Sequence, residues 1–182
     1  MANFKIKWNS ERILSMSAMS ISFITLVIFI YQTNLMSKQN YLSILPYLQI
    51  STSNNTAEGT FSVDISNHGV GPAIIESVKS EMQGEFLDLK EYHDYFWELL
   101  VSQDSILDSL KSVSTSTLNK GIAIPANTTY NIFKVNFTEE DRPKILRLIE
   151  LLERIPYEIR YKSIQNEHWV INETSEGPQK LD

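Results

Sequence analysis

Apolar residues follow two patterns along this chain: one long uninterrupted run near the N-terminus, then many short segments in which apolar and polar residues alternate. The run from Ile13 to Ser37 contains no charged residue, and its core, Ile13–Tyr31, is rich in Ile, Leu, Phe, Val and Met. A helix rises about 1.5 Å per residue, so roughly 20 residues cross a hydrocarbon layer about 30 Å thick. The pattern therefore predicts one transmembrane helix at residues 13–31 and contact with the lipid bilayer through it.

A cleaved signal peptide and a buried core helix are the alternatives for this segment. A signal peptide would have a shorter apolar region followed by small residues at a cleavage site, and residues 31–37 contain no A-x-A-like pattern. Trp8 and Tyr31 flank the run, where amphipathic rings favour the two membrane interfaces. These features favour an uncleaved signal anchor, which makes the chain a single-pass membrane protein.

The charges beside the run predict its orientation. Lys5, Lys7 and Arg12 precede it, whereas only Lys38 follows it closely. Because positive residues resist translocation, residues 1–12 are expected in the cytoplasm and the C-terminal head on the opposite side.

Small residues share one face of the predicted helix. Ser15, Ala18, Ser22 and Thr25 recur at spacings of three and four residues. Small residues let two helices approach closely in lipid, so this stripe is a candidate for helix pairing and for a homo-oligomer. The alternative is that Ser and Thr are simply tolerated, because their hydroxyls can bond back to their own helix.

Alternating segments dominate the rest of the chain and predict strands. Phe61, Val63 and Ile65 alternate with polar residues, which is typical of a strand with one buried face. The other segments with strand character are residues 46–51, 73–82, 121–124, 128–137, 157–164 and 167–171, and residues 51–59 are expected to form a loop. Many short strands separated by turns predict a mainly β (α+β) head, an immunoglobulin-like β-sandwich over residues 46–171. Residues 32–45 would form a connector and residues 172–182 a flexible tail.

Two segments of helical periodicity interrupt the strands. The first begins near Phe86 and runs to Leu100, followed at residues 105–119 by a helical tail and a strand. The second follows Thr138, has acids in its first turn and ends before Pro156. The sandwich is therefore expected to carry two helical insertions.

Composition excludes several chemistries. The chain has no cysteine, which rules out disulfides, thiolate catalysis and cysteine-based zinc sites. The net charge is −6, and the first 37 residues hold three cations and one acid, so the head is more acidic than the whole. An acidic head disfavours nucleic acid as a partner, because nucleic-acid binding needs a basic surface.

No catalytic, metal or cofactor motif stands out. His68, His93 and His168 lack ligand-like spacing, and no G-x-S-x-G, H-E-x-x-H or S-x-x-K element is present. The acids at residues 139–141 are better explained as charges at a helix start than as catalysts. We therefore predict no catalytic residue, no metal site and no cofactor.

The segment from Asn67 to Pro72 contains two glycines and resembles, in composition, a loop that could hold a phosphate. Gly69 and Gly71 permit close backbone approach, Asn67 can bond neighbouring backbone groups, and Pro72 fixes φ as the next strand begins. No lysine stands beside the glycines and no helix follows, so a structural turn is favoured.

Aromatic residues form a second stripe on the first predicted helix. Tyr92, Tyr95 and Leu99 recur at spacings of three and four. One helix cannot easily bury two faces against one sheet, so this stripe is a candidate partner surface. The alternative is that residues 105–119 cover it.

Three groups of residues carry a resemblance to a known group of proteins. They are Pro46-Tyr47-Leu48, the turn with its following Ala73, and Tyr161-Lys162-Ser163 with Glu167 and Trp169. The chain resembles uncharacterised bacterial single-pass membrane proteins that have an N-x-G-x-G-P-A turn and a late Y-x-S…E-x-W strand pair. The resemblance implies a bacterial inner membrane with the head periplasmic or extracellular, and it implies no activity.

These observations lead to three hypotheses of function. The first is a membrane-anchored, non-enzymatic protein-interaction module whose head binds another protein. The second is a ligand-sensing accessory subunit that signals through pairing at the stripe of Ser15, Ala18, Ser22 and Thr25. The third is a hydrolase whose active site has no sequence signal.

Overall fold

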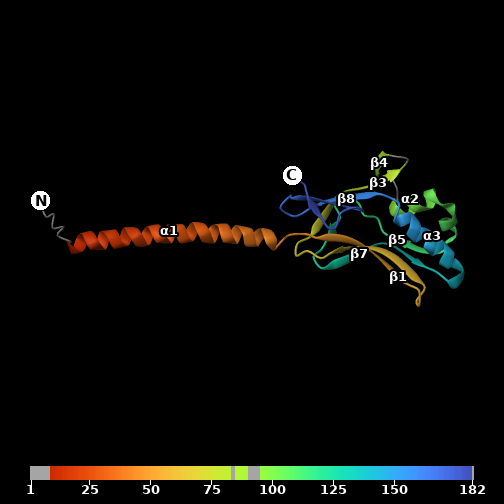
Figure 1. The fold of residues 1–182 in the computed structure, drawn as a ribbon, viewed down its shortest axis with the longest axis horizontal. Coiled ribbons are helices and arrows are strands. Elements are labelled where there is room, and N and C mark those ends of the chain that lie inside the picture. Colours follow the sequence, from red (N-terminus) through yellow and green to blue (C-terminus); the bar gives the residue numbers. More distant parts are fainter. Residues whose placement is uncertain (1–8, 83–84, 90–94, 182) are drawn as a thin grey trace. The chain divides into compact units, whose positions relative to one another are not determined.

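A computed structural model of the chain describes residues 9–82, 85–89 and 95–181. The chain divides into two units, residues 1–42 and residues 43–182. Figure 1 shows the elements of both units, and each is described here by itself.

The first unit contains one long helix, α1, from Ser10 to Leu42. It is long and apolar enough to cross a membrane, and none of its residues is buried. The helix extends through residues 32–42, which the sequence predicted to be a connector. No proline or glycine interrupts this stretch, so nothing in it breaks the helix before Leu42.

The second unit, the head, is built mainly from two antiparallel sheets. The first sheet has the order β1-β2-β7-β5, and the second has the order β10-β9-β8-β3-β4, with β6 paired to β3. The strands of the first sheet are β1 (Leu48–Asn55), β2 (Thr60–Asn67), β7 (Thr128–Asn136) and β5 (Ser112–Thr115). Those of the second are β3 (Ala73–Met82), β4 (Glu85–Asp88), β6 (Ala123–Ile124), β8 (Tyr157–Lys162), β9 (His168–Asn172) and β10 (Gln179–Lys180).

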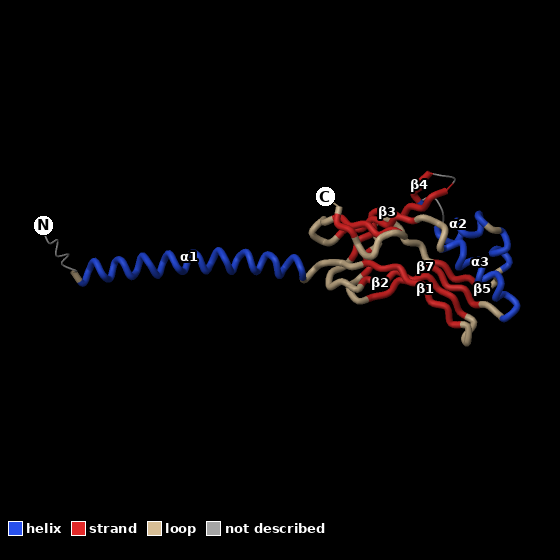
Figure 2. Tube along the Cα trace, in the orientation of Figure 1, coloured by secondary structure: helices blue, strands red, loops and turns tan. Residues whose placement is uncertain are grey.

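The two sheets share one hydrophobic core. Phe61 and Ile65 of the first sheet and Ile159 and Tyr161 of the second belong to the same cluster of buried side chains. In Figure 2, β3 runs along one side of the head and β1, β2 and β7 along the other. The described head is thus an α+β unit whose antiparallel sheets are compatible with a β-sandwich.

Bulges in two strands shift the alternation of buried residues. The register between β2 and β7 shifts between Val63 and Asp64 of β2, which pair with Phe133 and Asn131 of β7. The extra residue of β7 is Ile132, and both Ile132 and Phe133 are buried. In β3 the register with β8 shifts between Ile75 and Ser77. A bulge inserts one extra residue into a strand, so simple period-two alternation breaks at these points.

Short helices gather at one end of the head, away from the C-terminus (Figure 1). They are α2 (Tyr95–Gln103), η2 (Ser105–Ser109), η3 (Glu139–Asp141) and α3 (Arg142–Leu152). The helical turn and strand predicted within residues 105–119 correspond to η2 and β5. The helix predicted after Thr138 corresponds to η3 and α3, and the backbone N–H of Thr138 donates to the Asp141 carboxylate at 3.4 Å.

Three local predictions differ from the structure. No helix begins at Phe86, because Glu85–Asp88 pairs with β3 as a strand, and the described helix of this region is α2. Residues 51–55, predicted to be a loop, continue β1 because they pair with residues 60–64 of β2. Gln179 and Lys180, in the predicted flexible tail, pair with Val170 and Trp169 of β9.

Candidate functional site

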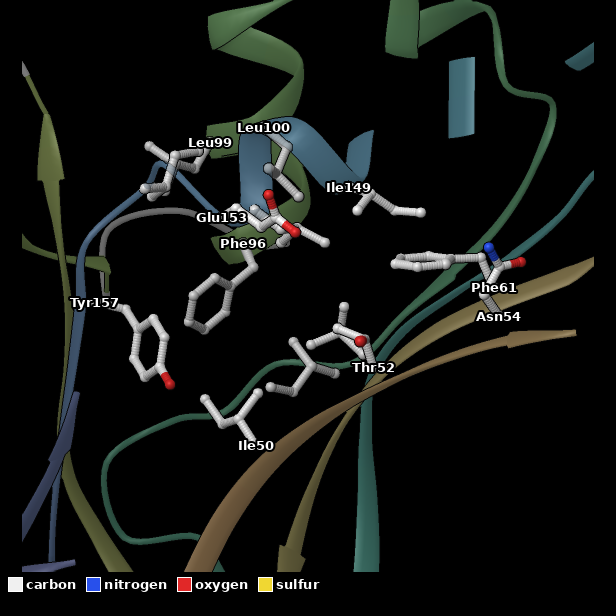
Figure 3. A pocket seen from close by; sticks show the side chains of 14 residues that line it. Ile50, Thr52, Asn54, Phe61, Phe96, Leu99, Leu100, Ile149, Glu153 and Tyr157 are labelled. Atoms are coloured by element: carbon white, nitrogen blue, oxygen red, sulfur yellow. The ribbon is translucent and has the colours of Figure 1, made fainter. Parts of the chain in front are cut away.

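A pocket of about 310 Å³ lies between the first sheet and the helices of the head. Its lining combines residues of β1, β2 and β7 with residues of α2, α3 and the start of β8. Figure 3 shows Ile50 and Thr52 on the sheet side and Phe96, Leu100 and Glu153 on the helix side. A volume of this size lies at the lower end of the range for small-molecule sites.

The sheet side of the pocket is one face of the β1–β2 pair. Because successive side chains of a strand point to opposite faces, Ile50, Thr52 and Asn54 of β1 share a face. Thr52 lies opposite Val63, and Asn54 lies opposite Phe61, and all four line the pocket. Thr52 and Asn54 are exposed and short, so the outer half of β1 does not fill the space that the sheet and helices enclose.

The described residues on the helix side are apolar except for one carboxylate. Phe96, Leu99 and Leu100 of α2 line the pocket together with Ile149 and Leu152 of α3. The carboxylate belongs to Glu153, the residue that ends α3, and this side chain is exposed.

An ion pair ties the helices to one another. The guanidinium of Arg147 in α3 donates from Nε to Oδ2 of Asp104 at 2.8 Å, and Asp104 also accepts from the backbone N–H of Ile106 in η2. These two hydrogen bonds hold the pKa of the Asp104 carboxyl below its ordinary value, and the Arg147 bond is the larger cause. The contact fixes η2 against α3, and so stabilises the helical wall of the pocket.

Tyr157, the first residue of β8, adds a phenol to the lining of the pocket. It also lines a smaller neighbouring cavity of about 120 Å³, as does Ile50. Burial raises the pKa of Tyr157, and the nearby carboxylate of Glu173 adds to this shift. The hydroxyl therefore stays protonated at neutral pH and can donate a hydrogen bond as well as accept one.

The predicted turn at residues 67–72 is a structural element away from this pocket. The buried Asn67 carboxamide accepts from the backbone N–H groups of Tyr47 and Gly69 and donates to the carbonyls of Gly71 and Ile124. All four of these hydrogen bonds join the side chain to backbone groups. The arrangement agrees with the structural reading of the turn.

The predicted partner surface is not an exposed face in the described residues. Leu99 is 2% exposed and points into the pocket, which corrects its assignment to an outer stripe. Tyr92 lies outside the described residues, and Tyr95 is the first residue of α2, of which the backbone alone is described. Leu99 is buried because α2 packs against both the core and α3, so the helix is covered on more than one side.

The stripe on α1 has its hydroxyls bonded within the helix. Ser15 donates to the carbonyl of Glu11 at 2.8 Å, Ser22 to that of Ala18 at 2.9 Å, and Thr25 to that of Ile21 at 2.8 Å. This is the geometry expected if these residues are tolerated in an apolar helix without a partner. Helix pairing remains a prediction.

The histidines do not converge in the described structure. His168 Nδ1 lies 2.7 Å from the Glu76 carboxylate on the second sheet, His68 lies in the turn after β2, and His93 is outside the described residues. Within residues 9–82, 85–89 and 95–181, no group of three or more His, Asp or Glu side chains could hold a metal ion.

Sequence reasoning missed the pocket. The sequence predicts a loop for residues 51–59, although Leu48 and Ile50 alternate with polar residues and the β-branched Thr52 continues the same spacing, which is a signal for a longer strand. No local signal could show that this face meets α2 and α3, because those helices lie 40 to 100 residues further along the chain.

Comparison with known protein families finds no match, and comparison with curated proteins finds none either.

Proposed function

We propose that this protein is a membrane-anchored, non-enzymatic binding subunit whose head captures a small apolar ligand in the pocket between β1–β2 and α2–α3. The pocket is the observation that carries the proposal. It is concave and mostly apolar, with a few polar groups at its edge, which is the usual character of small-molecule sites. In this proposal the head is an immunoglobulin-like sandwich with α2 and α3 as helical insertions that form the pocket wall.

The anchoring part of the proposal assigns α1 to a single membrane crossing. Its length and its charge-free core at Ile13–Tyr31 support this assignment. The excess of cations before the span supports a cytoplasmic N-terminus and a head on the far side of a bacterial inner membrane.

Protease protection tests the orientation. Sealed inner-membrane vesicles with the cytoplasmic face outward should protect the head from added protease until detergent opens them. Digestion of the head in intact vesicles of this orientation would contradict the proposed topology.

Photolabelling of the full chain in lipid nanodiscs tests the ligand site. The probe is a neutral aryl-alkyl diazirine, and the labelled peptides are identified by mass spectrometry. We expect labelled peptides from β1, α2 and the end of α3. Labelling confined to α1, where the probe meets lipid, would overturn the proposal.

Two matched variants make the test specific. Thr52→Trp places a large ring at the pocket edge and should reduce labelling of α2 and α3 by fivefold or more. Ser51→Trp places the same ring on the opposite face of β1 and should leave the labelling unchanged. Both positions are exposed, so neither substitution disturbs the core.

The same photolabelling experiment also tests the hypothesis that the head binds another protein. Labelled peptides that appear only when a second protein is present would favour it over a small ligand. Leu99, the described member of its predicted surface, lies inside the pocket.

A further inference from the structure

From the charges and rings around the pocket we infer that its ligand is an apolar molecule carrying one cationic amine. This inference deepens the proposed function and rests on it. The occupant is a small molecule with an aryl or alkyl body and an ammonium group at one end.

The charged residues that line the pocket indicate the sign of the ligand's charge. Among the described residues that line the pocket, Glu153 is the one carboxylic acid, and none is Lys, Arg or His. An anionic ligand would therefore meet a like charge and no counter-charge, whereas an ammonium would meet a carboxylate. No ion pair involving Glu153 occurs within the described residues, so this carboxylate is available to a ligand.

The end of α3 adds to the same negative potential. The pocket is lined by Leu152, the last residue of α3, and by Glu153 and Ile155, which follow it. The last turn of α3 contains no basic residue. The unsatisfied carbonyls at a helix C-terminus carry a partial negative charge that favours nearby cations. The carboxylate and the helix end thus act on the same part of the pocket.

Aromatic rings complete a site suited to an amine. Phe61, Phe96 and Tyr157 line the pocket (Figure 3). The face of an aromatic ring attracts a cation, and proteins use such rings to recognise ammonium ligands. The protonated hydroxyl of Tyr157 supplies a further polar contact, while its ring still packs against the apolar body of the ligand.

The size of the pocket limits the body of the ligand. An apolar cavity of about 150 Å³ accommodates benzene, so about 310 Å³ holds a body of roughly twice that volume. A single ring with a short alkyl chain fits this limit, and a full-length lipid chain exceeds it.

Three photolabelling probes that differ only in their end group test the inference. Each has the same phenyl-alkyl diazirine body and ends in an ammonium, a hydroxyl or a carboxylate. On the full chain in nanodiscs of zwitterionic lipid, pocket labelling should saturate at the lowest concentration for the ammonium probe and at the highest for the carboxylate probe.

Glu153→Gln should remove the advantage of the ammonium probe over the hydroxyl probe. We expect that advantage to be about twofold to fivefold, as for an exposed ion pair, and to shrink at high salt. Glu140→Gln is the matched control, since Glu140 is an exposed acid at the opposite end of the same helical segment and does not line the pocket.

The outcomes separate this inference from the proposed function. Equal labelling by all three probes would overturn the amine preference, and an ammonium advantage unchanged by Glu153→Gln would overturn the assignment of Glu153 as its cause; either result would leave the ligand site standing. Failure of all three probes to label β1, α2 or α3 would overturn the ligand site, and the amine preference with it.

Discussion

The carboxamide oxygen of Asn67 accepts a hydrogen bond from the backbone N–H of Tyr47 at 3.1 Å. The same side chain donates to the carbonyl of Ile124 at 3.0 Å, although Ile124 lies 57 residues away in the sequence. One buried side chain thus joins the segment that enters β1, the turn after β2, and β6. The turn secures the point at which the chain enters the head.

Asn67→Ala should destabilise the head by about 3 kcal/mol, because it leaves several buried backbone groups without partners. Asn67→Asp should be no better, because a carboxylate cannot donate to the carbonyls of Gly71 and Ile124. Thermal unfolding of the full chain in micelles, followed by tryptophan fluorescence, measures both effects. Stability close to that of the unsubstituted chain in both variants would contradict this account.

Gly71→Ala should also destabilise the head, by about 2 kcal/mol or more. A Cβ at this position would overlap the backbone of Ile44, which cannot move aside as a flexible side chain could. Gly121→Ala provides the contrast, because that residue has a φ of +91° but open space around it. The strain there is conformational alone, so the loss should be smaller, about 1 kcal/mol. A larger loss at Gly121 than at Gly71 would contradict the packing argument.

Acid should weaken the attachment of η2 to α3. In the folded head the pKa of Asp104 lies below the ordinary value of 3.8. The ionised carboxylate therefore contributes its full stabilisation above pH 3.8, and this contribution is lost as pH falls through the lower pKa of the folded state. Asp104→Asn should therefore reduce the loss of stability below about pH 4. Unfolding midpoints of both proteins across this range measure the difference. Parallel pH curves would show that the ion pair contributes nothing.

Alkali should destabilise the head through Tyr161. This ring is fully buried and its hydroxyl accepts from the backbone N–H of Leu48 at 3.4 Å. Burial raises the folded-state pKa of Tyr161 well above that of an exposed tyrosine. The folded head therefore keeps a proton that the unfolded chain releases, and stability falls as pH rises above about 10.

Tyr161→Phe tests the alkaline prediction. The variant should show a shallower loss of stability above about pH 10, although it starts from a lower value because the Leu48 N–H loses its acceptor. Ultraviolet absorbance should detect the phenolate of this residue only together with unfolding. Ionisation of every tyrosine in the folded protein would contradict it.

Substitution of the small residues on α1 tests helix pairing. Because the Ser22 hydroxyl already bonds to the Ala18 carbonyl, we expect Ala18→Leu and Ser22→Leu to leave the yield of self-crosslinking in membranes unchanged. Ile21→Leu, off the stripe, is the control. A drop in crosslinking specific to Ala18→Leu and Ser22→Leu would favour a pairing seam.

Local pattern predicted much of the head because its signals act over a few residues. Phe61, Val63 and Ile65 alternate with polar residues, and all three are buried in β2. Pro156 follows the end of α3, as expected of a residue that cannot continue a helix.

The predictions failed where pairing with a preceding strand outweighed the helical spacing or polar character of the segment itself. Phe86 has helical spacing with Leu89 and His93, yet it lies in β4 because Glu85–Asp88 pairs with β3. Gln179 and Lys180 read as a polar tail, yet they form β10, and Lys180 lies 2.7 Å from the Glu167 carboxylate and 5.9 Å from the Trp169 ring centre. Both partner strands were predicted, but the residue pattern of Glu85–Asp88 and of Gln179–Lys180 carries no strand signal that would indicate the pairing.

The amino-acid sequence by itself determined the long apolar helix and the antiparallel β character of the head. Each depends on residue spacing within a short window, where side-chain periodicity follows directly from backbone geometry. Only the tertiary structure decided that Ile50 and Thr52 face Phe96 and Glu153 across a pocket. That juxtaposition depends on how a sheet and two helices pack, and packing brings together residues whose separation along the chain carries no local signal.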